Sequence, residues 1–340
     1  MLDALATARR IVLEEEHVLG RDVLAGLAAL PREQVGDLLT LADDVRRRAS
    51  GDDAAVEVLF NAKKGGCSED CHFCSQSARY ATDVVAEPLR ETHEFLSAAR
   101  EARDRGAAEF CIVVAVRGPS AALLDRVCDA TRAIVADMPE MHVAVSLGIL
   151  SDLHCAALVE AGVRKVNHNL ETSRRHFPAI CTTHSYDERW ETCLRAKRHG
   201  LELCSGGIIG MGESPEDRLD FLCSLQALRP VEVPINFLNP RAGTPFADRS
   251  IVDPVEALRF VAMARLALPY ALVRLAGGRE ITLQGLQDLG MRSGASGIVL
   301  GAYLTTAGRE DEEDFAMLQR TGFRVLSGHG GVGALADSNP

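Results

Sequence analysis

The sequence has few aromatic residues, no excess of positive charge and no long apolar run. Aromatic residues make up 5% of the 340 positions, and the formal net charge is −11. Binding to the phosphates of nucleic acids needs a basic surface, so this charge argues against that class of protein. The sequence contains no run of about 18 apolar residues, so it predicts no transmembrane helix. Residues 1–17 also lack the apolar core and the cleavage site of a signal peptide.

Cysteine, in contrast, is abundant, with ten residues in the chain. Three of them lie within eight positions, which is a spacing typical of metal binding rather than of a disulfide framework. With no export signal, the thiols favour a reducing compartment. We therefore expect a cytoplasmic protein that binds neither nucleic acid nor a membrane.

From about residue 56, short apolar runs rich in β-branched residues alternate with longer helical patterns. Such alternation predicts parallel strands, and eight strand–helix units fit a (β/α)8 TIM-type barrel. A doubly wound open sheet is the competing fold, but no G-x-G-x-x-G turn follows the first strand. Strands are expected at 56–62, 109–116, 142–148, 165–170, 202–209, 231–238, 272–275 and 297–303, and helices near 91–105, 120–137, 151–161, 186–199, 215–228, 254–268, 281–293 and 310–321.

The chain divides into three expected parts. Residues 1–50 show leucines at helical spacing, with breaks at Pro31 and Gly51, and predict an N-terminal helical extension. Residues 51–323 would form the barrel. The small, glycine-rich residues that follow predict a flexible C-terminal tail at 324–340.

The run from Cys67 to Cys74 places three thiols at C-x3-C-x2-C spacing. Thiolates in such compact runs hold iron–sulfur clusters. No fourth cysteine follows nearby, since the next is Cys111. A zinc site completed by His72 is the structural alternative. On a four-iron cluster, three protein ligands leave one iron open to a non-protein ligand.

Other polar and sulfur-bearing residues fall at the ends of the expected strands. They are Asn167 to Glu171, Cys204, Asn236 and Arg274. In a (β/α)8 barrel the active site is built at the carboxyl ends of the strands, so these residues are expected to share one site.

Four segments of the sequence together resemble the biotin synthase family of radical S-adenosylmethionine enzymes, over about residues 56–323. They are CSEDCHFCSQSARY at 67–80, NHNLETS at 167–173, CSGGIIGMGE at 204–213 and VRLAGGRE at 273–280. The resemblance implies a radical sulfurtransferase that inserts sulfur into dethiobiotin to form biotin.

The resemblance also implies roles for individual residues. Cys67, Cys71 and Cys74 would hold a [4Fe-4S] cluster whose open iron is chelated by S-adenosylmethionine, which then yields a 5′-deoxyadenosyl radical. For the remaining contacts the resemblance implies Phe73 against the adenine, Asn169 and Glu171 on the ribose or substrate, Arg189 on the methionine carboxylate, and Asn236 on the dethiobiotin ring.

In this family a second, auxiliary cluster supplies the sulfur and is held by three cysteines and an arginine. Cys111, Cys204 and Arg274 match three of these positions, but Ala144 stands at the fourth. We take Cys181 as the replacement ligand, which would give a [2Fe-2S] cluster or a larger four-iron form. Arg274 would then be both a ligand and a catalytic residue.

Several residues have structural alternatives. Arg274 alone would also fit as a lumen arginine paired with a carboxylate such as Glu280 or Glu171. Cys181 would also fit as a packing residue, and His168 and His184 as hydrogen-bonded core or surface histidines. The cysteines on expected helices, Cys128, Cys155, Cys193 and Cys223, are expected to pack in the core.

The resemblance implies a reductant such as ferredoxin or flavodoxin, and a homodimer. Two other functions remain open at this point. The related barrels of hydrogenase maturation and methylornithine synthesis share the first cluster, and a non-catalytic iron–sulfur or zinc protein would sense redox state.

Overall fold

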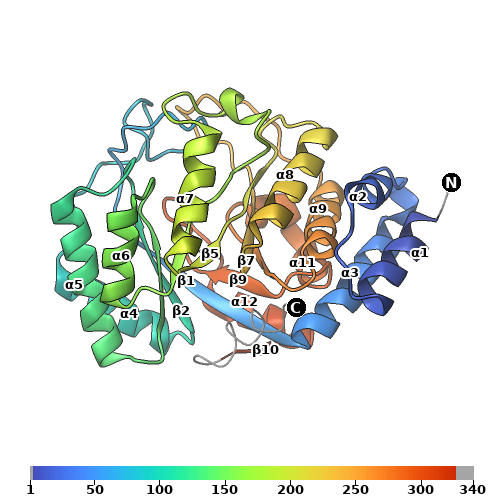
Figure 1. The fold of residues 1–340 in the computed structure, drawn as a ribbon, viewed down its shortest axis with the longest axis horizontal. Helices are drawn as coiled ribbons and strands as arrows, with labels where there is room; N and C mark the ends of the chain where they lie inside the picture. Colours follow the sequence, from blue (N-terminus) through green and yellow to red (C-terminus); the bar gives the residue numbers. More distant parts are fainter. Residues whose placement is uncertain (1–2, 327–340) are drawn as a thin grey trace.

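The strands form a closed parallel barrel in the computed structural model, which describes residues 3–326 (Figure 1). The strand order is β1-β2-β3-β4-β5-β7-β8-β9, and β1 pairs with β9 to close the ring. The predicted (β/α)8 barrel is therefore confirmed. The strands are β1 (Asp53–Lys63), β2 (Glu109–Val114), β3 (His142–Ser146), β4 (Lys165–Asn167), β5 (Glu202–Cys204), β6 (Gly207–Ile209), β7 (Glu232–Phe237), β8 (Leu272–Leu275) and β9 (Gly297–Leu300).

The strand expected at 202–209 is divided into β5 and β6. The break lies at Ser205 and Gly206, where the chain passes very close to β7: a Cβ atom on Gly206 would overlap the carbonyl oxygen of Pro234. The residue must therefore be glycine for the two strands to approach. β5 pairs with β4 and, at Cys204, with β7, whereas β6 pairs with β7.

The helices cover the outside of the barrel and begin close to their expected positions. Capping boxes at Ser151, Ser185 and Ser214 fix three of these starts. The helix expected at 281–293 is broken at Gln284, whose φ of 48° is left-handed. The helices are α4 (Thr92–Asp104), α5 (Ala121–Asp137), α6 (Asp152–Ala161), α7 (Tyr186–Arg198), α8 (Pro215–Leu228), α9 (Pro254–Ala267), α10 (Arg279–Leu283), the 3₁₀ turn η4 (Gln284–Leu286), α11 (Gln287–Met291) and α12 (Asp311–Arg320).

Residues 4–50 are helical and pack beside α8 and α9, as the blue helices in Figure 1 show. α9 is buried at every residue from Ala257 to Ala267 except Arg259, because the barrel covers one face and the N-terminal helices cover the other. The N-terminal elements are α1 (Ala4–Arg9), the π-helical turn η1 (Arg10–Glu14), α2 (Arg21–Ala28), the 3₁₀ turn η2 (Arg32–Gln34) and α3 (Val35–Ser50).

The C-terminal segment begins with the short strand β10 (Arg324–Val325), which pairs with Asp53 and Ala54 of β1. Two residues that the sequence assigned to the tail are thus part of the sheet. The rest of the expected tail, 327–340, lies outside the described residues. Within residues 3–326, every helix is too short or too polar to cross a membrane.

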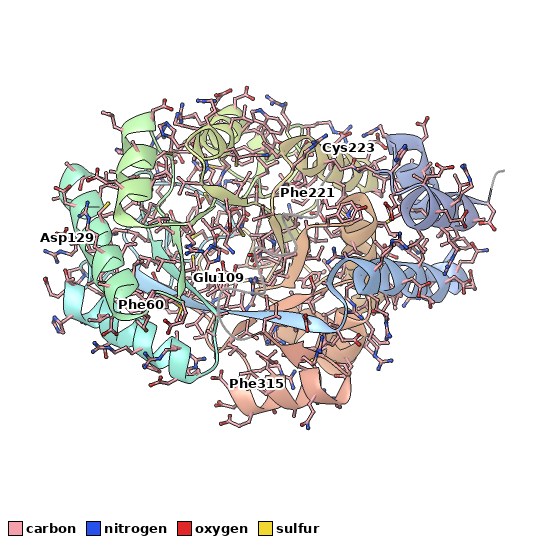
Figure 2. All side chains as sticks on the ribbon, turned by 60° about the horizontal axis from the view of Figure 1, so that its bottom comes forward. Phe60, Glu109, Asp129, Phe221, Cys223 and Phe315 are labelled. Atoms are coloured by element: carbon pink, nitrogen blue, oxygen red, sulfur yellow. The ribbon has the colours of Figure 1, made fainter. Side chains whose placement is uncertain are left out.

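Alternate residues of the strands face the lumen, as in other barrels. Figure 2 shows Glu109 of β2 toward the middle of the barrel, whereas Asp129 lies on the outer helix α5. Glu109 is 1% exposed. The inside of this barrel therefore carries charge, and the apolar core lies mainly between the strands and the helices.

Candidate active site

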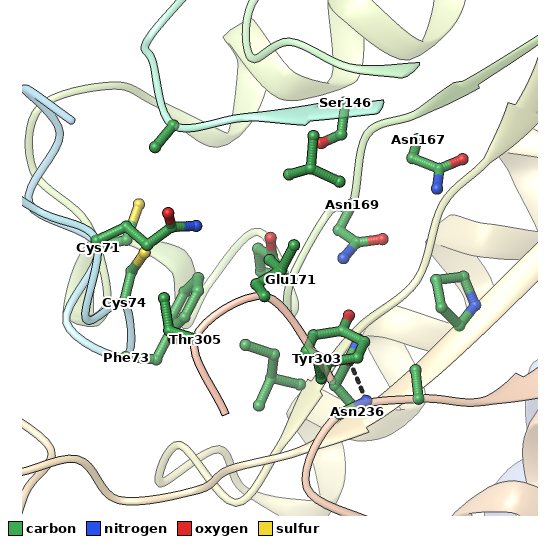
Figure 3. A pocket seen from close by; sticks show the side chains of 18 of the residues that line it. Cys71, Phe73, Cys74, Ser146, Asn167, Asn169, Glu171, Asn236, Tyr303 and Thr305 are labelled. Atoms are coloured by element: carbon green, nitrogen blue, oxygen red, sulfur yellow. Dashed lines mark hydrogen bonds between the residues drawn. The ribbon is translucent and has the colours of Figure 1, made fainter. Parts of the chain in front are cut away.

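A cavity of about 330 Å³ lies at the carboxyl ends of the strands. It extends from the Cys67–Cys74 loop at the mouth of the barrel to Glu57 and Cys204 in the lumen. Figure 3 shows Cys71, Phe73 and Cys74 on one side of it and Asn167 on the other, with Asn169 and Glu171 between them. Most of the expected site residues thus line one cavity, whereas Cys111, Cys181 and Arg274 are not part of its lining.

The loop that carries the three cysteines is closed by its own backbone. The Cys67 amide donates to the Gln76 carbonyl at 3.0 Å, and the Cys74 amide donates to the Cys71 carbonyl at 2.9 Å. All three cysteines line the cavity. This arrangement of thiols around one space fits a cluster that is held by three protein ligands.

A second loop, residues 180–184 after β4, is fixed to the cysteine loop by hydrogen bonds. Asp70 Oδ1 accepts from the amides of Thr182 at 2.9 Å and Thr183 at 3.1 Å, and the His72 amide donates to the Ile180 carbonyl at 2.9 Å. Burial would raise the pKa of Asp70, but these hydrogen bonds to its carboxylate outweigh burial and lower it. His72 is therefore part of a loop–loop contact through its backbone.

Cys181 lies on this second loop, with its sulfur 3.9 Å from that of Cys71 and 3.3 Å from His184 Nδ1. Hydrogen bonds from Cys71 and His184 lower the pKa of Cys181 to about 4. Among the described residues, Cys71, Cys181 and His184 form a group of potential ligands within 4.8 Å, and no such group joins Cys181 to Cys111 or Cys204. The structure thus brings Cys181 to the first cluster loop, not to the expected auxiliary ligands.

Arg189 of α7 is held in place by a chain of hydrogen bonds. Its Nε donates to His184 Nε2 at 3.0 Å, and its Nη1 donates to the Asn169 carbonyl at 2.8 Å. Since Nε2 accepts, His184 carries its proton on Nδ1, which lies 2.6 Å from Glu69 Oε2. His184 and Glu69 therefore orient a guanidinium that lines the cavity.

Glu171 has a strained backbone and an unpaired carboxylate oxygen. Its φ is 69°, which is unusual for a residue other than glycine, and its carbonyl approaches Gly207 so closely that a Cβ there would overlap it. Oε2 is buried without a hydrogen-bond partner. Burial raises the pKa of this carboxyl despite Arg189. A buried acceptor that faces the cavity fits a bound hydroxyl or amine.

Asn236 of β7 is fixed by the backbone, because its Nδ2 donates to the Gly207 carbonyl at 3.2 Å and its Oδ1 accepts from the Gly277 amide at 2.9 Å. Figure 3 shows where Asn236 lies in the cavity. Tyr303, after β9, also lines the cavity. Sequence reasoning missed Tyr303. The one feature of the sequence that could have indicated it is its position just after the last strand of the barrel.

Arg274 of β8 lies in the lumen and is completely buried. Its Nη2 donates to Glu109 at 2.8 Å, its Nε donates to Glu232, and Glu57 lies 3.5 Å from Nε. The structure thus pairs this lumen arginine with carboxylates. The expected partners were wrong, because Glu280 lies beside Arg279 and Glu171 beside Arg189.

Lys165 of β4 completes this buried group by contacting Glu109 and Glu232. We call Glu57, Glu109, Lys165, Glu232 and Arg274 the floor network. Sequence reasoning missed four of its members. Each is a charged residue in a strand, but which of them meet depends on the strand register.

Cys111 and Cys204 both lie in the lumen near the floor network. The sulfur of Cys111 accepts from Asn167 Nδ2 at 3.1 Å. Burial, and then the neighbouring carboxylates, raise the pKa of both thiols. The other cysteines lie on helices as expected: Cys128, Cys155 and Cys193 are buried, and Cys223 is partly exposed.

Comparison with known proteins gives consistent results for sequence and fold. Residues 64–223 match the Radical SAM superfamily, and residues 234–324 match the Biotin and Thiamin Synthesis associated domain. The chain is 49% identical to biotin synthase of Parafrankia sp. (strain EAN1pec), over 93% of this chain and 87% of that one. It is 47% identical to biotin synthase of Mycobacterium avium (strain 104), over 93% and 91%.

Among solved structures, methylornithine synthase covers 98% of both chains with a TM-score of 0.82 at 17% identity. The [FeFe]-hydrogenase maturase from Carboxydothermus hydrogenoformans has a TM-score of 0.81 at 17% identity and covers 95% of this chain and 79% of its own. At such low identity these two structures support the barrel fold alone.

Proposed function

The chain belongs to the biotin synthase family of radical S-adenosylmethionine enzymes, and from this premise we propose how its own residues serve the reaction. It is a biotin synthase, which inserts sulfur into dethiobiotin to form biotin. The observation that carries the assignment to individual residues is the cavity in Figure 3. Three thiols, an oriented arginine and a carboxylate with one unpaired oxygen line this cavity.

Cys67, Cys71 and Cys74 are the proposed ligands of the [4Fe-4S] cluster. When bound, the cluster and S-adenosylmethionine supply a 5′-deoxyadenosyl radical. The hydrogen bonds from residues 180–184 hold the cysteine loop in place, so the three thiols need little ordering when iron arrives.

Arg189 is the proposed partner of the methionine carboxylate. Its Nε and Nη1 donate to the protein, and no described residue accepts from Nη2. A guanidinium fixed on two sides can present its third nitrogen to a carboxylate with little loss of entropy. Glu171 Oε2 is the proposed acceptor for a ribose hydroxyl, with Asn169 beside it and Phe73 against the adenine.

Asn236 and the inner end of the cavity are the proposed site for dethiobiotin. Both polar atoms of the Asn236 amide are held by backbone groups, so its orientation is fixed before the substrate binds. Tyr303 closes the same region. Excluding water from this space protects a carbon radical from side reactions.

The reductant is a further partner of the reaction, and ferredoxin or flavodoxin remains our proposal for it. The homodimer stays a prediction. We also keep the cytoplasm as the proposed location, because all ten cysteines are free thiols and thiols persist in reducing compartments. The division at residues 50 and 323 stays a proposal for the domain boundaries.

The auxiliary cluster does not fit the residues in the form that the resemblance implies. Ala144 has no atom that can bind iron, and Cys181 lies beside Cys71. Arg274 donates its hydrogen bonds to carboxylates. Of the expected ligands, Cys111 and Cys204 are the only thiols in the part of the lumen that the structure describes. We derive no step through this cluster.

The test is an anaerobic turnover of the protein, loaded beforehand with iron and sulfide, with S-adenosylmethionine, a reductant and dethiobiotin. The sulfide bound during loading is the source of the inserted sulfur. Biotin and 5′-deoxyadenosine are both quantified. Formation of both is expected, and a Cys71→Ala variant is the negative control. If deoxyadenosine appears without biotin, the radical site is right but the substrate is wrong, and a reaction of the maturase or methylornithine type becomes the better assignment.

A further inference from the structure

We infer that Arg274 is a structural cation in this chain and not an iron ligand, so that the lumen does not hold a cluster of three cysteines and one arginine. This inference goes beyond the proposed function, because it concerns the auxiliary site and not the radical reaction itself. It follows from the hydrogen bonds, the charges and the neighbouring thiols of the floor network.

Every nitrogen of the Arg274 guanidinium already donates to the protein. Nε donates to Glu232, Nη2 donates to Glu109 at 2.8 Å, and Nη1 donates to the carbonyls of Ile298 at 2.9 Å and Ala55 at 3.3 Å. An iron ligand needs a nitrogen lone pair, and therefore a guanidinium that has lost a proton. The carboxylates of Glu232 and Glu109 instead accept hydrogen bonds from the protonated guanidinium.

The floor network also needs Arg274 to balance its charge. Glu57, Glu109 and Glu232 place carboxylate oxygens within 4.8 Å of one another, and their side chains are at most 3% exposed. Lys165 and Arg274 supply the only two cationic groups that the structure records in contact with these three carboxylates, apart from His142 beside Glu109. Turning Arg274 toward iron would leave buried carboxylates without their counter-ion.

The thiols at this depth are too few for the expected cluster. Ala144 pairs in register with Cys111 on the neighbouring strand, so the missing ligand leaves a methyl group beside the first thiol. Cys181 is fixed near Cys71 by Asp70 and His184. Cys111 and Cys204 remain, which is two thiols where the expected cluster needs three.

The direct test uses the native chain with ¹⁵N in the guanidino groups of arginine. The iron-loaded, reduced protein is examined by pulsed electron paramagnetic resonance for hyperfine coupling between ¹⁵N and any iron–sulfur centre. We expect no arginine coupling. A ¹⁵N coupling that disappears in Arg274→Lys would overturn the inference.

A pair of variants gives an independent readout. Arg274→Lys keeps one positive charge, and Arg279→Lys is the matched control, since Arg279 is equally buried and pairs with Asp314 away from the lumen thiols. Both variants should keep the wild-type iron and sulfide per chain and unfold at a lower temperature. Loss of iron and sulfide in Arg274→Lys alone would contradict us. If that variant does not fold, the ¹⁵N measurement on the native chain still decides.

Biotin and deoxyadenosine are quantified on the same wild-type samples. A failure to form biotin would count against the proposed function. The ¹⁵N coupling and the iron and sulfide content report on Arg274 whether or not biotin is formed. The two conclusions can therefore fail separately.

Discussion

The mouth and the floor of this barrel are both rich in charge and sulfur, but they are built in opposite ways. At the mouth, loops contact each other through backbone amides and short side chains, as Asp70 does with residues 182 and 183. At the floor, long side chains from β1, β2, β4, β7 and β8 meet in pairs of opposite charge. At the mouth some polar side-chain groups have no hydrogen-bond or ion-pair partner, whereas at the floor almost every such group has one.

This difference separates a binding site from a structural site. Glu171 Oε2 has no partner, and Arg189 has a nitrogen that no described residue engages. Arg274 is as deeply buried, yet each of its nitrogens is already used. Similar residue types thus receive a ligand at one end of the barrel and hold the strands together at the other.

The largest effect is expected for Cys71→Ala at the mouth. Two thiols cannot hold the four-iron cluster, so S-adenosylmethionine cleavage should be abolished while the barrel stays folded. Iron content, deoxyadenosine formation and circular dichroism measure the three parts of this statement. Retention of a full cluster would mean that Cys181, 3.9 Å away, can replace Cys71 as a ligand.

The next largest effect is expected for Lys165→Met at the floor. Removing one partner of a buried ion pair costs roughly 3–5 kcal/mol, because the remaining charge is left uncompensated. Urea unfolding of the variant should show a loss of about this size, with iron at the Cys67–Cys74 loop unchanged. A loss no greater than that of the surface variant Arg100→Ala would show that the floor network contributes little.

A smaller effect at the mouth is expected for His184→Ala. Arg189 would lose the acceptor of its Nε, and hydrogen bonds to charged groups are worth about 1.5–3 kcal/mol. We expect the affinity for S-adenosylmethionine, measured by equilibrium dialysis, to fall roughly tenfold or more. The free energy of unfolding should change little. His184→Gln should restore much of the affinity, since its amide can accept from Arg189 and donate to Glu69. Equal losses in both variants would argue against a positioning role.

The smallest effect is expected for Cys181→Ala. The thiol makes hydrogen bonds with Cys71, Asp70 and His184, so its loss should lower the free energy of unfolding by about 1 kcal/mol. Iron and sulfide per chain should stay at wild-type values. Loss of part of the iron, with the Cys67–Cys74 cluster intact, would instead support the hypothesis from the sequence that Cys181 is an auxiliary ligand.

The site residues at the mouth could be predicted from the sequence because the patterns that indicate them are local. Cys67, Cys71 and Cys74 lie on one loop, and the strands that carry Asn169 and Asn236 have clear apolar patterns. The floor network could not be predicted from the sequence. Arg274 contacts a carboxylate 165 positions away, and this contact depends on the register of the strands. Cys181 was placed at the correct end of the barrel, but Asp70 draws its loop toward Cys71.

The floor network has a consequence for the order in which reactants bind. Because it occupies the lumen at the inner end of the cavity, we expect small molecules to enter past the Cys67–Cys74 loop. A substrate held near Asn236 then lies behind the nucleoside held near Arg189 and Glu171. We expect steady-state kinetics with compulsory order, in which dethiobiotin adds first, and S-adenosylmethionine bound early traps the enzyme in a complex that cannot turn over.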